Sequence, residues 1–283
     1  MRTFPPFRSS KSAKHSAAGS GWCTRGVQLL AACSLGLTSL YGETMIDGSA
    51  IITSRSGSPM VTDSSDQQIA ADIHDVFLPS GSKLTTEEDG QIFFTLSNGV
   101  ALAMDEQTSV KFLEYTQRVF DQEDQSRGPE PSISKLDLEF SEGQFAIASN
   151  RLSPLSEVRI RLPKGEVRLH KGTCLIRLDS TGLHLTAFEG SLTFFYPDDN
   201  GREFIPAPER IRISEQSMER QQIAETFPLE SLDAESKLLC QAAQHASQRV
   251  TFKPNATSNR PPVPVLIVEP AYFQQTPLRP YQF

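Results

Sequence analysis

The stretch from residue 156 to 195 constrains the fold more than any other part of this chain. Its apolar and polar residues alternate, and a glycine interrupts the alternation about every ten residues. Val158, Ile160 and Leu162 share one parity, and the two arginines between them share the other. Because strand side chains alternate between two faces, the apolar set can be buried while the arginines stay in water. The pattern predicts short, half-buried strands.

Five runs of this kind are expected within the stretch, separated by four turns. The runs cover 158–162, 167–169, 174–178, 183–187 and 192–194, and the turns fall at 163–165, 170–172, 179–182 and 189–190. Such close spacing leaves no room for crossover helices, so the strands should join by hairpins or solenoid-like turns. The prediction is an all-β body, built as two packed sheets or as a short β-solenoid with a jelly-roll-like arrangement. Rossmann folds and β/α barrels are excluded.

The flanking sequence extends this all-β body and then departs from it. The clearest hairpin is Gln91–Leu96 followed by Val100–Met104, where Asn98 and Gly99 supply the positive φ of a tight turn. Residues 121–132 contain no large apolar side chain and are expected to be a mobile loop. A helix is predicted from Leu229 to Arg249, and the proline-rich tail after it should be extended or disordered, with a short strand near 265–268.

The order of turns and apolar positions resembles the FecR domain over roughly residues 50–195. The central stretch carries the resemblance through Leu162, Pro163, Gly165, Val167, Gly172, Thr173, Leu175, Leu183, Leu185, Glu189 and Gly190. Two upstream segments carry it through Ile92, Phe94, Leu96, Asn98, Gly99, Val100, Leu102, Thr108 and Val110, and through Leu136, Leu138, Gly143, Phe145 and Ile147. The resemblance implies a role in envelope signalling, in which FecR proteins couple an outer-membrane event to transcription. Typical members carry a cytoplasmic anti-sigma region of several dozen residues before a membrane segment. Here about 26 residues precede the apolar segment, so direct control of a sigma factor is not expected.

Charge is distributed unevenly along the chain. The net charge is -7, but Arg2, Arg8, Lys11, Lys14 and Arg25 all precede the first acid, Glu43. Residues 43–283 therefore hold 22 basic and 34 acidic side chains, a net charge of -12. Such a surface repels phosphate backbones and anionic headgroups, which excludes nucleic acid as an expected partner.

An apolar segment follows the basic leader at Val27–Gly42. It holds sixteen residues without a charge, fewer than the roughly 20 that a spanning helix needs, so a cleaved secretory signal is the preferred interpretation. An uncleaved anchor is one alternative, and a lipoprotein signal ending at Cys33 is another. The predicted location is periplasmic or secreted, with membrane contact only through residues 27–42 if they are retained. The expected divisions are 1–42 as signal or anchor, 43–213 as the β domain, 214–250 as the helical segment and 251–283 as the tail.

The sequence offers few groups for catalysis. Its five histidines form no HxxxH or HxH pair, there is no CxxC, and GxSxG is absent. The acidic run at Glu87, Glu88 and Asp89 lacks the alternating spacing of a calcium loop and is interpreted as a solvated turn. Cys174 and Cys240 remain if the leader is removed; they are expected to be separate thiols, with Cys174 in the core, and a disulfide is the alternative. No metal, cofactor or catalytic residue is predicted.

One possible binding patch stands out in the otherwise acidic chain. It comprises Arg159, Arg161, Arg168, Lys171 and Arg177. These cations could bind an acidic partner or an anionic polymer; the alternative is that they pair with carboxylates on neighbouring strands. The leading hypothesis is a non-enzymatic, exported FecR-like binding module for an envelope protein or polysaccharide. The other candidates are a β-rich carbohydrate-active enzyme, for which two facing carboxylates in a crevice would speak, and a structural envelope scaffold.

Overall fold

A computed structural model gives the fold and describes residues 44–120, 132–149, 151–197, 201–214, 224–255 and 259–266. By contacts the chain divides into residues 1–41 and 42–283, and every described residue belongs to the second unit. The predicted signal segment, the loop at 121–131 and the tail beyond 266 lie outside the described residues. In the described part, no helix is long and apolar enough to cross a membrane.

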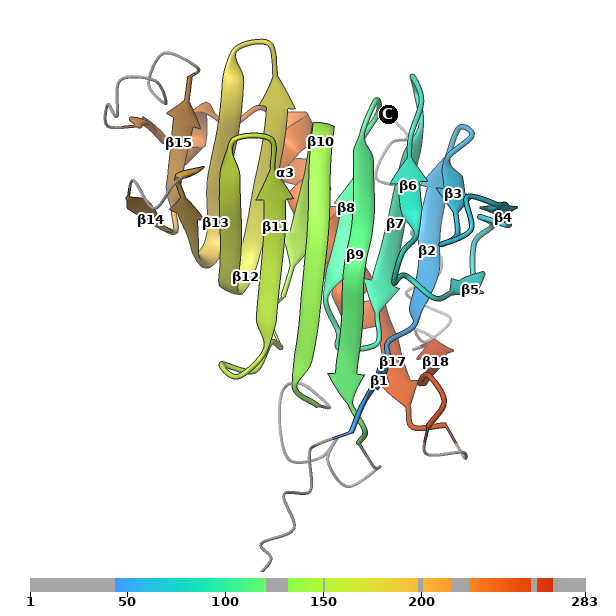
Figure 1. Cartoon of the computed structure of the whole chain (residues 1–283). Coiled ribbons are helices and arrows are strands. Elements are labelled where there is room, and N and C mark those ends of the chain that lie inside the picture. The colour runs from blue at the N-terminus through green and yellow to red at the C-terminus, as the bar shows by residue number, and fades with distance from the viewer. Residues whose placement is uncertain are drawn as a thin grey trace, which may run out of the picture. The chain divides into compact units, whose positions relative to one another are not determined.

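Most of the described chain forms one sheet of sixteen strands, seen in Figure 1. Its strands are β1 Met45–Asp47, β2 Ala50–Ser56, β3 Met60–Thr62, β4 Gln68–Ile69, β5 Val76–Phe77, β6 Lys83–Thr85, β7 Gln91–Leu96, β8 Ala101–Met104, β9 Ser109–Arg118, β10 Ser134–Ala148, β11 Glu157–Leu162, β12 Gly165–Asp179, β13 Gly182–Phe195, β14 Arg202–Pro206, β15 Glu209–Ile213 and β16 Glu225–Pro228. The all-β prediction is confirmed.

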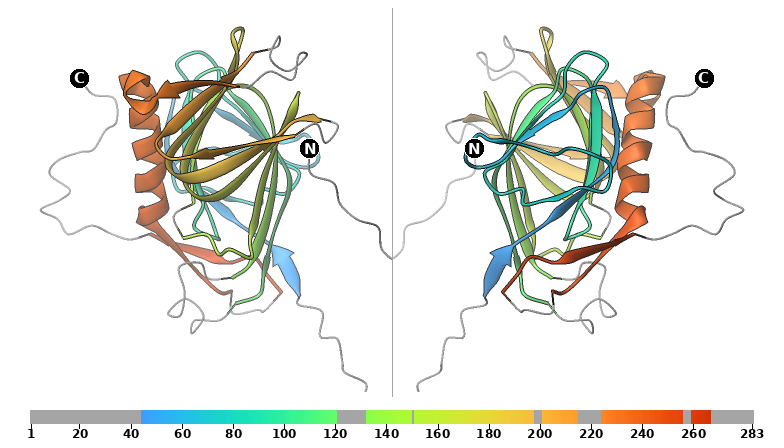
Figure 2. Two further views of the ribbon diagram at one scale, coloured as in Figure 1. Left: turned by 90° about the vertical axis from the view of Figure 1, so that its left-hand side faces the viewer. Right: turned by 90° about the vertical axis from the view of Figure 1, so that its right-hand side faces the viewer.

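Three long strands fold this sheet into two layers. The first half of β10 pairs with β9 and β11, and its second half pairs with β8 and β12. In the same way β12 and β13 each change partners midway. The front layer therefore runs β4-β3-β6-β9-β10-β11-β12-β13-β14, with β1 beside β9, and the back layer runs β5-β2-β7-β8-β10-β12-β13-β15-β16. Figure 2 shows the strands curling around the space that the core fills.

The long strands bend at irregularities that the sequence marks with glycine. The β12–β13 ladder shifts register at residues 169–171 and 173–174, and Gly172 lies opposite Gly190 between these shifts. Both glycines have positive φ, and a Cβ on Gly190 would lie 1.6 Å from the carbonyl oxygen of Lys171. Only glycine lets the two backbones approach this closely. The prediction of turns at 170–172 and 189–190 was wrong: five expected runs form three strands, because the chain bends there without leaving the ladder.

The main core lies between the two layers. It takes Phe94 from β7, Phe112 from β9, Phe145 from β10 and Ile176 from β12, all fully buried. The back layer is also buried on its outer face, where Phe93, Ala103, Ala146, Ala148 and Leu175 contact a helix. Alternate residues of β7, β8 and the second half of β10 thus face two separate apolar clusters. Nearly every residue of these segments is therefore buried.

The covering helix is α3, Ala234–Arg249, preceded by the short 3-10 turn η2, Leu229–Ser231. Figure 2 shows α3 along the outer side of the back layer. Asp233 caps it, because its Oδ1 accepts a hydrogen bond of 2.7 Å from the backbone N–H of Ser236. The predicted helix is confirmed, but it begins at residue 234 because Pro228 and the cap end the preceding extended chain.

A second, small sheet follows the helix. It pairs β17, Val250–Lys253, with β18, Val263–Leu266, two residues before the strand expected in the tail. Val250 and Phe252 pack on Ile51 of β2, and the Ser49 hydroxyl donates a 2.6 Å hydrogen bond to the carbonyl of Pro262. The end of the described chain is thereby fixed to its beginning.

The predicted β7–β8 hairpin is confirmed in position, and so is the positive φ of Gly99, but the positive φ expected of Asn98 was wrong. Gly99 has φ +84°, whereas Asn98 contributes through its side chain, whose Oδ1 accepts from the N–H of Val100 at 3.0 Å. Asn98 is fully buried, and its amide nitrogen donates to the Ser134 hydroxyl. The residue is therefore both a turn former and a link between the hairpin and β10.

Candidate functional site

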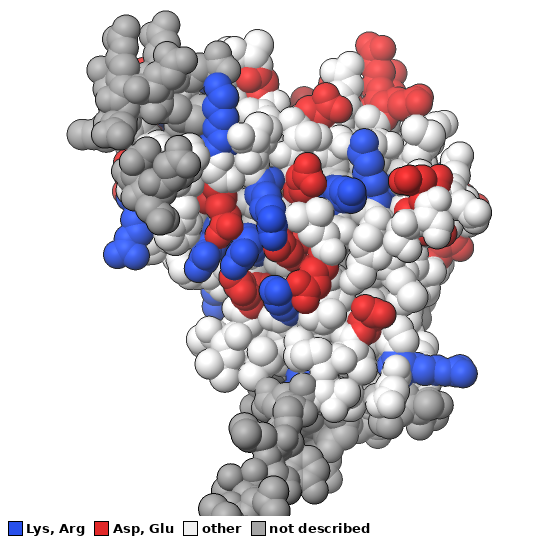
Figure 3. All heavy atoms as spheres, viewed as in Figure 1, with Lys and Arg blue, Asp and Glu red and all other residues white. Residues whose placement is uncertain are grey.

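The outer face of the front layer holds three residues of the predicted patch, Arg159, Arg161 and Arg168. We call its central part the charged face and define it by ten charged residues of β9 to β12: Lys111, Glu114, Lys135, Asp137, Glu139, Glu157, Arg159, Arg161, Glu166 and Arg168. Figure 3 shows acidic and basic side chains intermixed across this face. In Figure 1 the same strands lie in front, with α3 behind them.

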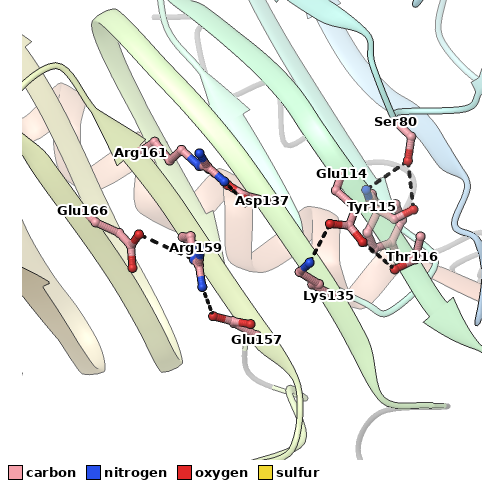
Figure 4. A network of polar contacts seen from close by, with 10 residues as sticks. All are labelled: Ser80, Glu114, Tyr115, Thr116, Lys135, Asp137, Glu157, Arg159, Arg161 and Glu166. Carbon is pink, nitrogen blue, oxygen red and sulfur yellow. Dashed lines mark hydrogen bonds and ion pairs between the residues drawn. The ribbon is translucent and has the colours of Figure 1, made fainter.

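Arg161 and Asp137 make the best-defined contact of the charged face. The parallel pairing of β11 with β10 sets their strands side by side, and the guanidinium grips the carboxylate at both oxygens, with Nε–Oδ1 3.0 Å and Nη2–Oδ2 2.7 Å. The Asp137 side chain is only 5% exposed, whereas that of Arg161 is 52% exposed. The arginine thus covers a buried acid from the solvent side (Figure 4).

Arg159 lies between two carboxylates. Its Nη2 donates to Glu157 at 2.7 Å, and its Nε lies 3.5 Å from Glu166 (Figure 4). The hydrogen bond to Glu157 raises the pKa of Arg159, although burial opposes it. For Arg161, the hydrogen bond to Asp137 and the charge of that acid raise the pKa. Both guanidinium groups are therefore firmly charged and firmly held.

The rest of the charged face follows the same pattern of pairing. Lys135 contacts Glu114 at 2.6 Å, and Arg168 contacts Glu166 at 2.8 Å while its guanidinium lies 4.9 Å from the ring centre of Phe195. Beyond Arg168 the face becomes aromatic: Phe204 on β14 is 60% exposed. The parity of the central stretch predicted the outward arginines, but nothing local in the sequence indicated which carboxylates would meet them.

The charged face carries equal numbers of the two charges. It holds five basic residues, Lys111, Lys135, Arg159, Arg161 and Arg168, and five acidic ones, Glu114, Asp137, Glu139, Glu157 and Glu166. Each of the three arginines contacts at least one of these acids. The alternative interpretation, in which the cations pair with nearby carboxylates, therefore agrees with the ion pairs of Arg159, Arg161 and Arg168.

The other two residues of the predicted patch lie elsewhere. Lys171 is exposed at the bend of β12, next to Gly172. Arg177 lies on the outer face of the back layer, because it shares the parity of Leu175, which packs on the helix side, and of Thr173, whose hydroxyl accepts a hydrogen bond from Gln244 of α3. The ladder irregularities around residue 170 change which parity faces outward. Three of the five predicted residues share one surface.

An open groove of about 760 Å³ lies where β8 and β12 end, beside the middle of β10. Its lining includes Asp105, Glu142 and Asp179. Asp105 is held in place, since Gln91 donates to its Oδ1 at 2.8 Å and Gln144 donates to its Oδ2 at 3.2 Å. Glu87, Glu88 and Asp89 form the turn before β7, as expected, and no cluster of His, Cys, Asp or Glu in the described ranges could hold a metal ion.

Cys174 and Cys240 are both buried free thiols. Cys174 belongs to the core between the layers, and Cys240 belongs to the apolar cluster between the back layer and α3. The thiols thus face different clusters, as expected for two separate apolar cysteines.

The fold defines an all-β protein with a doubled sheet and one covering helix. Comparison with known proteins adds little to this class. No family model matches the sequence, and no curated protein matches it. Two crystal structures from Parabacteroides distasonis ATCC 8503, each described provisionally as an anti-sigma factor, align with TM-scores of 0.35 and 0.34 and 10% sequence identity. The alignments cover 64% and 66% of this chain and 97% and 99% of those chains.

Proposed function

We propose that this chain is a non-enzymatic binding module of the cell envelope, exported by its N-terminal segment, that holds a partner protein on the charged face. The observation that carries the proposal is the difference between the two layers. On the outer face of the back layer, α3 covers β7, β8, β10 and part of β12, whereas the outer face of the front layer presents charged side chains to solvent. Three arginines and an exposed aromatic side chain on this face are of the residue types enriched in protein interfaces.

The pattern of charge favours a protein over an anionic polymer. A polyanion gains little from a face with five charges of each sign, because every arginine it engages already contacts a carboxylate. A protein surface can present acids opposite the cations and cations opposite the acids. The fixed pairs, above all Arg161 with Asp137, keep this pattern rigid before binding, which lowers the entropy lost on association. Phe204 at the margin of the face provides an apolar anchor.

Site-specific photo-crosslinking in the native host tests the proposal. A benzoylphenylalanine in place of Phe204 should give a discrete protein adduct, and the same group in place of the exposed Gln241 on α3 should give none. The charge reversal Lys111→Glu should abolish the adduct, because it changes the pattern of the charged face without uncovering a buried acid. Lys253→Glu, an equal change of charge on β17, is the matched control and should leave the adduct intact.

Equal adducts from Phe204 and Gln241, or an adduct indifferent to Lys111→Glu, would refute binding on the charged face. The enzymatic alternative makes a separate demand. A carbohydrate-active enzyme would use the acids of the open groove. If the chain turned over an envelope polysaccharide and Asp105→Asn abolished that turnover, the protein would be an enzyme and not a binding module.

A further inference from the structure

A second group of cations lies on the outer face of the back layer, apart from the charged face. Arg177 of β12, His184 of β13 and Arg212 of β15 occupy one row across three neighbouring strands, and Arg210 occupies the next row. The four residues, which we call the arginine cluster, come from three strands of a single sheet. Phe227 of β16 lies beside them, 5.7 Å from the guanidinium carbon of Arg210 and 5.5 Å from that of Arg212.

The carboxylates around the arginine cluster are already engaged. Asp179 pairs with Arg177 at 3.0 Å, and it also accepts hydrogen bonds from the backbone and hydroxyl of Thr181. Glu225 pairs with Arg212, and Asp233 accepts from the backbone and hydroxyl of Ser236 as the cap of α3. Arg210 forms no ion pair and no side-chain hydrogen bond within the described residues; its contact is the ring of Phe227.

Buried side-chain nitrogen atoms without a hydrogen-bond partner concentrate at this place. The described residues contain five buried side-chain nitrogen atoms without a hydrogen-bond partner, and four of them belong to the cluster: Nε of Arg177, Arg210 and Arg212, and Nδ1 of His184. The Nε of Arg177 faces Asp179 as an ion pair without a hydrogen bond. The His184 side chain is only 8% exposed, and its Nε2 is 2.8 Å from the Thr181 hydroxyl. The three Nε–H groups are donors, and buried donors destabilise a fold unless an acceptor reaches them. Nδ1 of the neutral His184 ring carries no proton, because Nε2–H donates to the Thr181 hydroxyl, which itself donates to Asp179; Nδ1 becomes a donor when the ring is protonated.

The electrostatics also favour an added negative charge. Burial and the neighbouring Arg177 lower the pKa of His184, against the opposing effect of Asp179. Burial and Arg177 likewise lower the pKa of Arg210. The cluster therefore disfavours its own positive charge. Arg177 and Arg212 remain 31% and 35% exposed, so part of each side chain stays open to solvent although its Nε is not.

We propose that Arg177, His184, Arg210 and Arg212 form a binding site for an oxyanion of the phosphate class. Such an ion accepts hydrogen bonds from several directions, which suits donors supplied by three strands. It enters from solvent beside Arg210, whose guanidinium forms an ion pair with no carboxylate of the described residues, although Asp233 and Asp179 are near enough to act on its charge. A turn of the guanidinium groups brings their Nε–H groups to the oxygens of the ion. The site is separate from the charged face, so each can fail without the other.

Calorimetric titration of the full chain with inorganic phosphate tests the site. Saturable binding at one site is expected, and Arg210→Gln should weaken it at least tenfold. Arg55→Gln is the control, since Arg55 lies on β2, outside the arginine cluster, is as exposed as Arg212 at 35%, and is ion-paired with Asp72; this variant should bind phosphate as the unchanged chain does. Parallel titrations with glycerol 3-phosphate and with acetate distinguish a phosphate ester from the free ion and a phosphate from a carboxylate.

A spectroscopic measurement on the unchanged chain tests the site without depending on whether the Arg210→Gln variant folds. Phosphate should raise the pKa of His184, followed by its imidazole NMR signals, and should leave the signals of the exposed His245 in place. Absence of saturable phosphate binding, equal binding by Arg210→Gln, or a His184 titration indifferent to phosphate would each overturn the proposal. Acetate binding as tight as phosphate binding would overturn the assignment to the phosphate class.

Discussion

Arg161 covers Asp137 from the solvent side, and the two residues meet because β11 runs parallel to β10. The pair combines an almost fully buried acid with a half-exposed base that holds both its oxygens. Parallel neighbours need a connection that crosses over. Here the chain between Ala148 and Glu157 provides it, and its described residues, 149 and 151–156, contain no helix. The contact therefore depends on tertiary structure, although both residues lie in stretches with a clear strand pattern.

Replacing Arg161 by Ala should destabilise the protein by about 1–3 kcal/mol, because it leaves the carboxylate of Asp137 buried without its partner. Urea unfolding followed by circular dichroism measures the change. The control is Lys135→Ala, which breaks a pair exposed on both sides and should cost less than about 1 kcal/mol. Equal losses for the two variants would show that the burial of Asp137 contributes nothing.

Gly190→Ala should destabilise the protein by more than about 2 kcal/mol. The glycine has φ +74°, and the added Cβ would collide with the backbone of Lys171 where β12 and β13 bend. Gly201→Ala is the comparison: Gly201 also has positive φ, but its Cβ would meet only Tyr196 at 3.9 Å. The unfolding temperature of Gly190→Ala should be well below that of Gly201→Ala. The reverse order would contradict the close approach of β12 and β13.

Cys174 and Cys240 should resist alkylation in the folded protein. Burial raises the pKa of Cys240 to about 12 and raises the pKa of Cys174 as well, so neither thiol ionises near pH 8. Iodoacetamide labelling mapped by mass spectrometry should find both residues unmodified until denaturant is added. A reducing agent should leave the unfolding temperature unchanged, and a drop of several degrees would instead indicate a disulfide.

Asp233→Ala should cost about 1 kcal/mol at pH 7 through loss of the helix cap. Burial alone would raise the pKa of Asp233, but the hydrogen bonds from Ser236 outweigh it and lower the pKa overall. An acid with a lowered folded pKa stabilises fully above its unfolded pKa of about 3.9 and loses that contribution as the pH falls through the folded value. The difference in unfolding free energy between the unchanged protein and Asp233→Ala, measured by urea unfolding, should therefore shrink below about pH 4. A constant difference from pH 7 to pH 3 would show that the charge of the cap does not matter.

Local patterns in the sequence were sufficient to predict single elements. Alternation gave the strands around Val158 and Ile160, and Gly99 marked the β7–β8 turn. Pairing over long distances was not predictable in this way. The same glycines that mark turns also permit bends, so Gly172 did not reveal that β12 continues through it.

The candidate sites show the same division. The parity of one strand placed Arg159 and Arg161 on an outward face, but the carboxylates that meet them come partly from β10 and β12, which the sequence could not align. Arg177 was grouped with them because parity was carried through the bend, where the ladder shifts register. Arg210, which forms no ion pair with any described residue, lies outside the central stretch, and no local signal in the sequence distinguishes it.

The hydrogen bond from Ser49 to Pro262 has a consequence for how the protein is made. Ile51 lacks its cover until Val250 and Phe252 have emerged from the ribosome, so β2 waits for residues translated about 200 positions later. Assembly of this domain cannot be completed segment by segment during synthesis. A polypeptide released early would carry an uncovered Ile51, a mark by which quality-control proteases can tell it from the finished molecule.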